Sequence, residues 1–561
     1  MSANDSSPSF SPVLAPGALA APHLRLLEAL GRATPKAAAD PLRTRRVFVN
    51  RTVRMDRVDV LGFDMDYTLA LYNQPRMEAL SAACTLRKMV QGRGYPASLL
   101  DLPYDARMAI RGLVVDKRHG NVLKMDRYGY VGRACHGTRP LSREERRHMY
   151  REQKLRLTGG RYAFIDTLFA LPESVLYAQA VDALERDPAF SSSSADARSG
   201  RYAQLWTDIR NSIDEAHHDD SIKSEITARL SDYIIQDPEL APTLHRFRSA
   251  GRRLFLLTNS GYAYTDRVMS YLLDGRLSSY PTWRHYFDVV IVDARKPEFF
   301  LTDRPLQLLD DSGNVTGELP RGVQAANLGG CRPILCQGGN VQALSDLLAL
   351  PADRVLYVGD HIYGDMLKAK KSSVWRTAMI IQELEAELER HTQVEESLRN
   401  LEALERRRHR MEAEQRYQQL LLQQLDAVES DPTLASEIMA APLSEMPDLH
   451  PTELKRVLAT PSLRQSLVAK ARDELARRIA ELRHDQQGCL EDVYALERDI
   501  EHTFNPFWGP LFKEGSENSR FGEQVEDYAC LYTSRVSNFL AYSPFQLFRS
   551  PRDHLPHERV Y

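Results

Sequence analysis

VDVLGFDMDYTL, at residues Val58–Leu69, is the stretch that decides the fold. Its apolar first half suits a buried β-strand, and two carboxylates, Asp64 and Asp66, follow. An apolar strand that ends in paired acids places them at the carboxyl edge of a sheet, where open α/β folds bind ligands. Alternatively, the two acids could be a chance DxD pair or could cap a helix, with no functional role. A calcium loop is disfavoured because Leu69 and Pro75 stand where that loop needs glycine and glutamate.

Three later apolar runs end in polar side chains in the same way. Arg253–Leu257 precedes Thr258, Asn259 and Ser260, Phe287–Val292 precedes Lys296, and Arg354–Val358 precedes Asp360 and Asp365. Helical segments separate the runs, which predicts an α/β fold with a parallel sheet and right-handed crossovers. The carboxyl ends of parallel strands converge on one crevice. Each group alone could be structural: the Thr-Asn-Ser run could cap a helix, and Lys296 could be a surface lysine.

The predicted crevice contains four carboxylates, one ammonium and neutral hydrogen-bond donors. Clustered carboxylates need a counter-charge, and oxygen ligands without cysteine or clustered histidine indicate Mg²⁺, which prefers a phosphate in its shell. Asp64 can attack phosphorus, and Asp66, with a raised pKa, can protonate the leaving oxygen and later deprotonate water. Lys296, Thr258 and Asn259 can hold the remaining phosphate oxygens.

The composition is that of a large protein with nearly balanced charge. A formal charge of −3 over 561 residues gives no reason to expect nucleic acid or an acidic membrane as a partner. Six scattered cysteines without zinc-site spacing predict free thiols, and we expect a cytoplasmic protein. Residues 1–22 lack the basic region of a signal peptide, and no apolar run reaches the roughly 18 residues of a membrane span.

The predicted catalytic core is discontinuous in sequence. We expect a disordered leader at 1–45 with a short helix at 23–31, a core from 46–75, 250–380 and 501–557, a cap at 76–249, and a helical hairpin at 381–500. In the hairpin, apolar residues recur at steps of three or four on both sides of a Pro-rich turn, which predicts an antiparallel coiled coil. We also expect a homo-oligomer, a dimer or tetramer.

The cap is predicted to combine strands and helices. Residues 111–135 alternate apolar and polar side chains around two turns, which predicts a β-hairpin or meander. A basic helix is expected at 142–157, a flexible loop at 191–200, and a helix at Tyr202–His218. Arg210, Asp214 and His217 share one face of that last helix, where the plainest interpretation is a surface ion-pair ladder.

The strand-end motifs DMDYT, TNS, DARKP and GDHIYGD resemble those of the haloacid dehalogenase superfamily of phosphohydrolases. Longer stretches such as NVLKMDRYGYVGRACHG and YFDVVIVDARKPEFF are similar to the cytosolic purine 5′-nucleotidases that prefer IMP and GMP. The resemblance covers about residues 46–380 and 500–557 and implies a Rossmann-like core with an inserted α+β cap. The long hairpin and the missing acidic C-terminal tail depart from the family.

The resemblance also implies a role for each motif residue. Asp64 would be the nucleophile and Asp66 the acid and base, with Mg²⁺ held by Asp64, the Asp66 carbonyl, Asp360 and Asp365. The phosphate would be bound by Thr258, Asn259, Ser260 and Lys296. The nucleoside would be bound from the cap by Phe169, which stacks on the base, and by Arg210, Asp214, His217 and Lys223.

Several positions depart from that pattern. Asp166 and Ala170 stand where the family has asparagines near the base and the effector site, which changes the available hydrogen bonds. His218 replaces a tyrosine. The base preference therefore stays open. The family's nucleotide effector site would fall near Tyr363 and on Lys368, Lys370 and Lys371, although these lysines could equally form a solvated helix face.

We therefore predict a Mg²⁺-dependent 5′-nucleotidase that acts on nucleoside 5′-monophosphates, with phosphotransfer to nucleosides as a side activity. The alternatives are a catalytically weak scaffold on the same fold and a phosphatase for a non-nucleotide phosphomonoester.

Overall fold

The computed structural model describes residues 41–150, 155, 159–191, 193–320, 322–324, 333–349, 351–367, 374–428, 452, 456–457, 459–552 and 554–558. The predicted leader helix at 23–31, the three lysines at 368, 370 and 371, and most of the Pro-rich turn of the hairpin lie outside these residues. The fold described below is that of the compact unit Thr44–Tyr561. No helix within the described ranges combines the length and apolar character that a membrane span requires.

A ten-stranded sheet forms the core, in the order β1-β20-β17-β16-β3-β11-β12-β15-β13-β14. Its parallel strands are β3 (Val60–Phe63), β11 (Arg253–Leu257), β12 (Val289–Val292), β15 (Ile334–Gly338), β16 (Val355–Gly359), β17 (Arg376–Ile380) and β20 (Leu531–Thr533). Antiparallel strands β1 (Phe48–Val49), β13 (Leu306–Leu309) and β14 (Val315–Glu318) complete the two edges. The α/β prediction is confirmed, and the structure adds β15, β17 and β20 to the parallel strands expected from the sequence.

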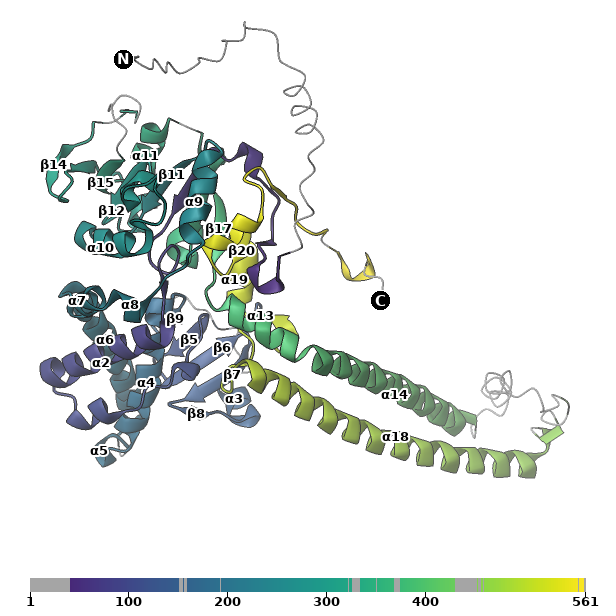
Figure 1. Ribbon diagram of the computed structural model, residues 1–561. Coiled ribbons are helices and arrows are strands. Elements are labelled where there is room, and N and C mark those ends of the chain that lie inside the picture. Colours follow the sequence, from purple (N-terminus) through teal and green to yellow (C-terminus); the bar gives the residue numbers. More distant parts are fainter. Residues whose placement is uncertain are drawn as a thin grey trace, which may run out of the picture. The chain divides into compact units, whose positions relative to one another are not determined.

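The central strands are apolar throughout because both faces of the sheet are covered. Successive side chains alternate between two separate core clusters, with Leu256 and Val290 in one and Phe255 and Val289 in the other. Helices α9 (Leu240–Ser249), α10 (Tyr262–Leu273), α11 (Val341–Leu348) and α19 (Arg520–Tyr528) belong to this part of the molecule (Figure 1). A sheet buried on both faces needs continuous apolar runs instead of alternating ones.

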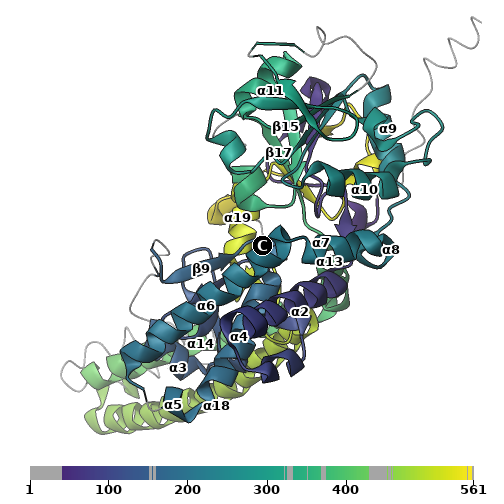
Figure 2. The ribbon, with the colours of Figure 1, turned by 90° about the vertical axis from the view of Figure 1, so that its left-hand side faces the viewer.

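The segment between β4 (Leu71–Tyr72) and β10 (Ile234–Ile235) forms the α+β cap, which ends before the predicted boundary at residue 249 because α9 packs with the core. Its five-stranded antiparallel sheet has the order β8-β7-β6-β5-β9. These strands are β5 (Leu113–Asp116), β6 (Asn121–Met125), β7 (Val131–His136), β8 (Arg139–Pro140) and β9 (Tyr162–Ile165), which confirms the predicted meander. The cap helices are α2 (Gln74–Arg93), α3 (Arg143–Tyr150), α4 (Leu171–Glu185), α5 (Pro188–Ser191), α6 (Ala195–His218), α7 (Ser221–Ala228) and α8 (Leu230–Tyr233). Helices α2, α4 and α6 pack against one another (Figure 2).

The predicted flexible loop at 191–200 is wrong in its second half. Helix α6 begins at Ala195, and the Ser194 hydroxyl accepts a hydrogen bond from the Ala197 N–H at 3.3 Å. Ser194, which belongs to the serine-rich run predicted as a loop, is therefore the N-cap of α6. Its hydroxyl satisfies one backbone N–H donor of the first helical turn.

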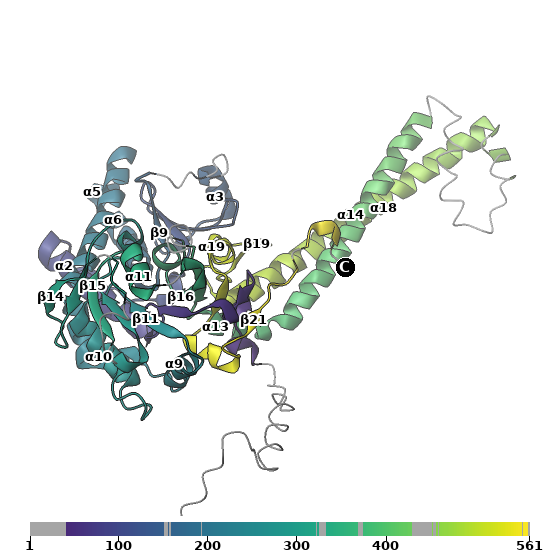
Figure 3. The same ribbon diagram turned by 90° about the horizontal axis from the view of Figure 1, so that it is seen from above.

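Two long helices form the predicted antiparallel hairpin. Helix α13 (Leu384–Gln393) leads into α14 (Glu395–Val428), and α18 (Pro461–Phe504) lies alongside α14 (Figures 1 and 3). Contacts between the helices run in opposite directions along the two sequences: Val394 packs with Ile500, the Cys489 thiol lies 3.6 Å from the Leu404 carbonyl oxygen, and Arg478 pairs with Glu414 at 2.8 Å. The two helices are therefore antiparallel.

The short remaining strands pair with segments distant in sequence or form a local hairpin. They are β2 (Val53–Arg54) with β21 (Leu547–Phe548), β4 with β10 (Ile234–Ile235), and β18 (Lys513–Glu514) with β19 (Glu517–Asn518).

Candidate active site

Parallel register brings the strand-end motifs to one edge of the sheet. Phe63, the last residue of β3, lies opposite Leu256 of β11 and Val358 of β16. The Asp64 N–H continues the ladder to the Val358 carbonyl oxygen at 2.9 Å. Asp64, Thr258 and Asp360 therefore leave neighbouring strands at the same end, where open α/β sheets bind ligands.

Lys296 joins two of the predicted side chains, Asp64 and Asp365, into one centre. Its Nζ lies 2.9 Å from Asp64 Oδ2 and 2.7 Å from Asp365 Oδ1, and donates to the Tyr357 hydroxyl at 2.9 Å. The lysine side chain is only 4% exposed. Although burial disfavours the ammonium, Asp365 and Asp64 raise the pKa of Lys296 above its ordinary value. The lysine is a buried, permanent cation at the strand ends, which excludes the alternative of a surface lysine.

Three carboxylates could hold a metal ion here. Asp64, Asp360 and Asp365 are buried, and one oxygen of each lies within 4.8 Å of the others. Among the described residues, Asp360 Oδ2 is buried and has no hydrogen-bond partner, which costs free energy unless a cation binds there. Burial, followed by the charge of Asp365, raises the pKa of Asp360 to about 7. An all-oxygen donor set with one orphaned carboxylate oxygen fits Mg²⁺.

The neighbourhood of Asp66 differs from that of Asp64. Asp66 Oδ1 accepts from the Tyr72 hydroxyl at 2.6 Å and Oδ2 from the Ser260 hydroxyl at 2.8 Å. Tyr264 lies behind, with its hydroxyl 2.9 Å from that of Tyr72. Burial raises the pKa of Asp66, as predicted, while the bonds from Tyr72 and Ser260 lower it. The two tyrosines were not identified from the sequence, since neither belongs to a strand-end motif.

The Thr-Asn-Ser segment holds the site in shape as well as lining it. The Thr258 hydroxyl accepts from the Ser260 N–H at 3.1 Å. The Asn259 side chain bonds the Lys296 backbone twice, accepting from its N–H at 2.6 Å and donating to its carbonyl oxygen at 3.0 Å. Asn259 is exposed, so its observed contact positions Lys296. The predicted phosphate contact of Asn259 stays a prediction.

A cleft of about 440 Å³ leads from Asp66 toward the cap. Its lining includes Phe169, Asp214, His217 and Lys223, together with Ser260 and Asn259. The Phe169 ring stands edge-on to Tyr67, with centroids 4.6 Å apart, and edge-on to His217 at 5.8 Å. Burial, then the charge of Lys223, lowers the pKa of His217 to about 4. Four of the predicted cap residues are thus brought together with the acid end of the site.

The structure does not place Arg210 or Asp166 in the lining of this cleft. Arg210 donates to the buried Glu173 at 2.7 Å, and Asp166 lies 3.5 Å from His361. Glu173 has one carboxylate oxygen without a partner among the described residues, and burial raises its pKa to about 7. Tyr363, near which the family's effector site would fall, is 45% exposed.

Arg111 is a further residue of the site that sequence reasoning missed. It is 1% exposed and donates to the Asp360 carbonyl oxygen at 2.9 Å. The same guanidinium makes two bonds to Glu383, at 2.8 and 2.6 Å. An arginine before an apolar strand carries no local signal of this role, because its partners lie more than 240 residues away.

The model of the 5′ nucleotidase family matches residues 47–560. A 5′-nucleotidase domain-containing protein of Dictyostelium discoideum is 26% identical over 524 residues, which is 91% of this chain and 74% of that protein. The 5′-nucleotidase domain-containing protein 2 of Homo sapiens and that of Rattus norvegicus are each 30% identical over 374 residues, 63% of this chain. The chain spans 66% and 62% of these two relatives, just under two thirds of their length.

Two solved structures are also similar in part. CbbY from Rhodobacter sphaeroides in complex with phosphate has a TM-score of 0.20 and 15% identity, and a 2-haloacid dehalogenase from Pseudomonas syringae has 0.19 and 14%. Each comparison covers 58% of this chain and 86% of the other. Because these TM-scores are low, the fold is assigned from the sheet order and strand register described above.

Proposed function

The chain belongs to the 5′ nucleotidase family, and from this premise we propose that it is a Mg²⁺-dependent hydrolase of nucleoside 5′-monophosphates, purine ones foremost. The family and the names of the relatives support a phosphoric monoester hydrolase. The observation that carries the proposal is the position of Lys296 Nζ, between Asp64 Oδ2 and Asp365 Oδ1 at 2.9 and 2.7 Å. A buried ammonium beside a carboxylate nucleophile is a suitable binding group for a phosphate dianion.

In the first step, a carboxylate oxygen of Asp64 attacks phosphorus and the bond from phosphorus to the 5′ oxygen breaks. Asp64 Oδ1 accepts from the Met65 N–H at 2.7 Å and Oδ2 faces Lys296 Nζ at 2.9 Å, so both oxygens are held in place and Oδ2 lies on the side of the phosphate-binding cation. Asp66 gives its proton to the departing 5′ oxygen, so that the nucleoside leaves neutral. The product on the protein is an aspartyl-phosphate.

In the second step, Asp66 removes a proton from water, and the resulting hydroxide attacks phosphorus and frees Asp64. Tyr72 and Ser260 hold the two oxygens of Asp66 in both steps. Asp64, Asp360, Asp365 and the Asp66 carbonyl would hold Mg²⁺, which supplies positive charge for the phosphoryl oxygens. Interception of the aspartyl-phosphate by a nucleoside instead of water gives the phosphotransferase side activity.

The cleft at Phe169 supports a nucleoside as the leaving group. Phe169 offers an aromatic face or edge for a base, while Asp214, His217 and Lys223 provide polar groups around it. Burial keeps His217 neutral at physiological pH, so it can both donate and accept a hydrogen bond. A flat, polar-edged purine suits such a mixture of aromatic and polar groups.

Phosphate release from IMP, GMP, AMP, UMP and CMP with Mg²⁺ tests the proposal, with ribose 5-phosphate as the matched substrate that lacks a base. We expect the purine nucleotides to give the highest kcat/KM. Faster hydrolysis of ribose 5-phosphate than of any nucleotide would indicate a non-nucleotide phosphatase. No release from any of the six compounds would indicate a scaffold protein.

We also propose a cytoplasmic location. The five described cysteines, Cys84, Cys135, Cys336, Cys489 and Cys530, are all free and buried. Unpaired thiols in a large chain are typical of a reducing compartment. A homo-oligomer remains a prediction, and sedimentation of the purified protein measures it directly.

A further inference from the structure

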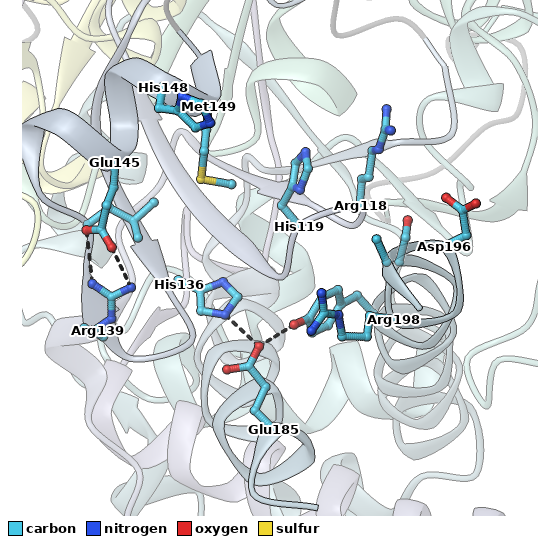
Figure 4. A pocket seen from close by; sticks show the side chains of 14 residues that line it. Arg118, His119, His136, Arg139, Glu145, His148, Met149, Glu185, Asp196 and Arg198 are labelled. Carbon is cyan, nitrogen blue, oxygen red and sulfur yellow. Dashed lines mark hydrogen bonds and ion pairs between the residues drawn. The ribbon is translucent and has the colours of Figure 1, made fainter. Parts of the chain in front are cut away.

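A second cavity, of about 490 Å³, lies within the cap. It shares no lining residue with the cleft at Asp66. Figure 4 shows the side chains that line it, which come from the β5–β6 turn, from β7 and β8, from α3 and from the ends of α4 and α6. Six of them are basic: Arg118, His119, His136, Arg139, His148 and Arg198. The proposed reaction uses none of these residues, and only His136 falls in a stretch quoted above for the family resemblance.

A hydrogen-bond chain from behind the cavity holds His136, which is one of its lining residues. The Tyr150 hydroxyl donates to the buried Asp116 at 2.9 Å and so accepts from Asn121 Nδ2 at 2.7 Å. Asn121 therefore turns its oxygen toward His136 Nδ1, 2.7 Å away. The other ring nitrogen, Nε2, faces a Glu185 carboxylate oxygen at 2.8 Å. Both ring nitrogens of His136 are thus engaged with oxygen atoms, which fixes the orientation of the ring.

Two of the three acids in the lining are already occupied. Glu185 accepts from His136 and from the Tyr202 hydroxyl (Figure 4). Glu145 makes two bonds to Arg139, each at 3.1 Å. The third acid, Asp196, lies in the first turn of α6, where the helix N-terminus favours a carboxylate.

Four basic side chains of the cavity are available to a ligand. Within the described part of the chain, the side chains of Arg118, His119, His148 and Arg198 make no ion pair and no side-chain hydrogen bond. Two arginines and two imidazoles around one space match the several acceptor oxygens of a phosphate group, since guanidinium binds phosphate in a bidentate manner. Leu141 and Met149 add an apolar wall beside them.

We propose that this cavity binds a small organic phosphate, with its phosphoryl group between Arg118 and Arg198 and its organic part against Leu141 and Met149. The volume lies within the roughly 300–1,000 Å³ that small-molecule sites occupy. Asp196 opposes an anion, so its removal strengthens binding. The site is independent of the proposed function, because none of its residues belongs to the catalytic centre.

Titration calorimetry of the full chain with inorganic phosphate and with ribose 5-phosphate tests this site. EDTA is kept present so that the carboxylates of the metal site, without a metal, repel phosphate. Arg118→Gln combined with Arg198→Gln should weaken binding of both probes by at least about tenfold. Asp196→Asn should strengthen it. The matched control, Arg143→Gln with Arg147→Gln, removes the same charge from exposed positions of α3 outside the lining and should bind as the wild type does.

Unchanged affinity in the Arg118 and Arg198 variant, an equal loss in the α3 control, or no binding by the wild-type chain would each overturn the proposal. Equal affinity for the two probes would overturn the organic part of it. Hydrolysis of nucleotides should be the same in all these variants. Because Arg118 is exposed and Asp196 changes affinity in the opposite direction, misfolding cannot produce the expected pattern.

Discussion

At the residue scale, the two acids of the DMD motif are two positions apart and have different partners. Asp64 faces the Lys296 ammonium, and Asp66 faces the hydroxyls of Tyr72 and Ser260. Tyr67, which follows Asp66, has a φ of 56°, a conformation that non-glycine residues rarely adopt. The chain turns sharply at this point, and the two carboxylates enter different surroundings. Asp64 is suited to nucleophilic attack beside a cation, and Asp66 is suited to proton transfer.

Tyr72→Phe should lower kcat about tenfold and leave KM nearly unchanged, because it removes the 2.6 Å donor that orients Asp66. Tyr264→Phe is the matched control, since it removes a hydroxyl from the same pair but keeps the bond between Tyr72 and Asp66. Steady-state kinetics on IMP measure both variants. An equal fall in kcat for the two would contradict an orienting role specific to Tyr72.

Phe169→Leu should raise KM for IMP about tenfold, because an aliphatic side chain fills the space without offering an aromatic surface to the base. KM for ribose 5-phosphate, which has no base, should stay the same. If both substrates lost affinity equally, Phe169 would serve the packing of Tyr67 and not the base.

At the element scale, the root of the helical hairpin contacts both acid-bearing loops. Glu383, just before α13, holds Arg111, which in turn holds the Asp360 carbonyl oxygen. The preceding residue, Gln382, donates to the Tyr72 carbonyl oxygen at 2.6 Å. The hairpin is therefore continuous with the scaffold of the active site at its base.

Arg111→Leu should destabilise the protein by about 3 kcal/mol, since it leaves the Glu383 carboxylate without its buried partner. It should also raise the Mg²⁺ concentration needed for half-maximal activity, because the Asp360 peptide loses its anchor. Glu383→Gln keeps the contact to Asp360 but leaves the buried Arg111 guanidinium without its counter-charge, so it should destabilise the protein by a similar amount, about 3 kcal/mol, with less effect on the Mg²⁺ requirement. Urea unfolding and Mg²⁺ titration measure the two effects. Identical Mg²⁺ requirements in both variants would speak against the anchor.

Glu387 of α13 should make stability depend on pH. Its carboxylate accepts from the Leu511 N–H at 2.8 Å, and burial raises its pKa to about 7. The folded protein therefore keeps a proton that the unfolded chain releases near its ordinary value, so stability falls as pH rises from about 4.5 to about 7. Glu387→Gln should reduce this pH-dependent fall in the free energy of unfolding by on the order of 2 kcal/mol. Unfolding titrations at about pH 5 and pH 8 measure it, and a difference from wild type that does not change with pH would refute it.

At the scale of the whole molecule, the features that could be predicted from the sequence are those that depend on local patterns of residues. The strands ending at Asp64, Thr258, Lys296 and Asp360 were found because long apolar runs end in polar groups. Strands β15, β17 and β20 were not recognised from the sequence, and long-range pairing within the sheet identifies them. The roles of Tyr72 and Arg111 depend likewise on partners brought together only by the tertiary fold.

The cap was predicted less completely than the core. Its meander and the long helix α6 follow from local periodicity, and the start of α6 was missed because a serine-rich run contains its N-cap. The cleft lining depends on which face of α6 meets α7 and the strand ends, so His217 and Asp214 lie in it while Arg210 pairs with Glu173. The spacing of side chains along α6 alone cannot decide which of them line the cleft.

The central claim is that strand ends distant in the sequence form one phosphomonoesterase with Asp64 as its nucleophile. Acid quench of the protein during turnover of IMP with Mg²⁺, followed by mass spectrometry of the peptide that contains residue 64, tests it most directly. The account predicts a phosphoryl adduct on Asp64, absent when Mg²⁺ is omitted, and no phosphate release by Asp64→Asn. Phosphate release by Asp64→Asn at the wild-type rate, or an adduct on a different residue, would contradict it.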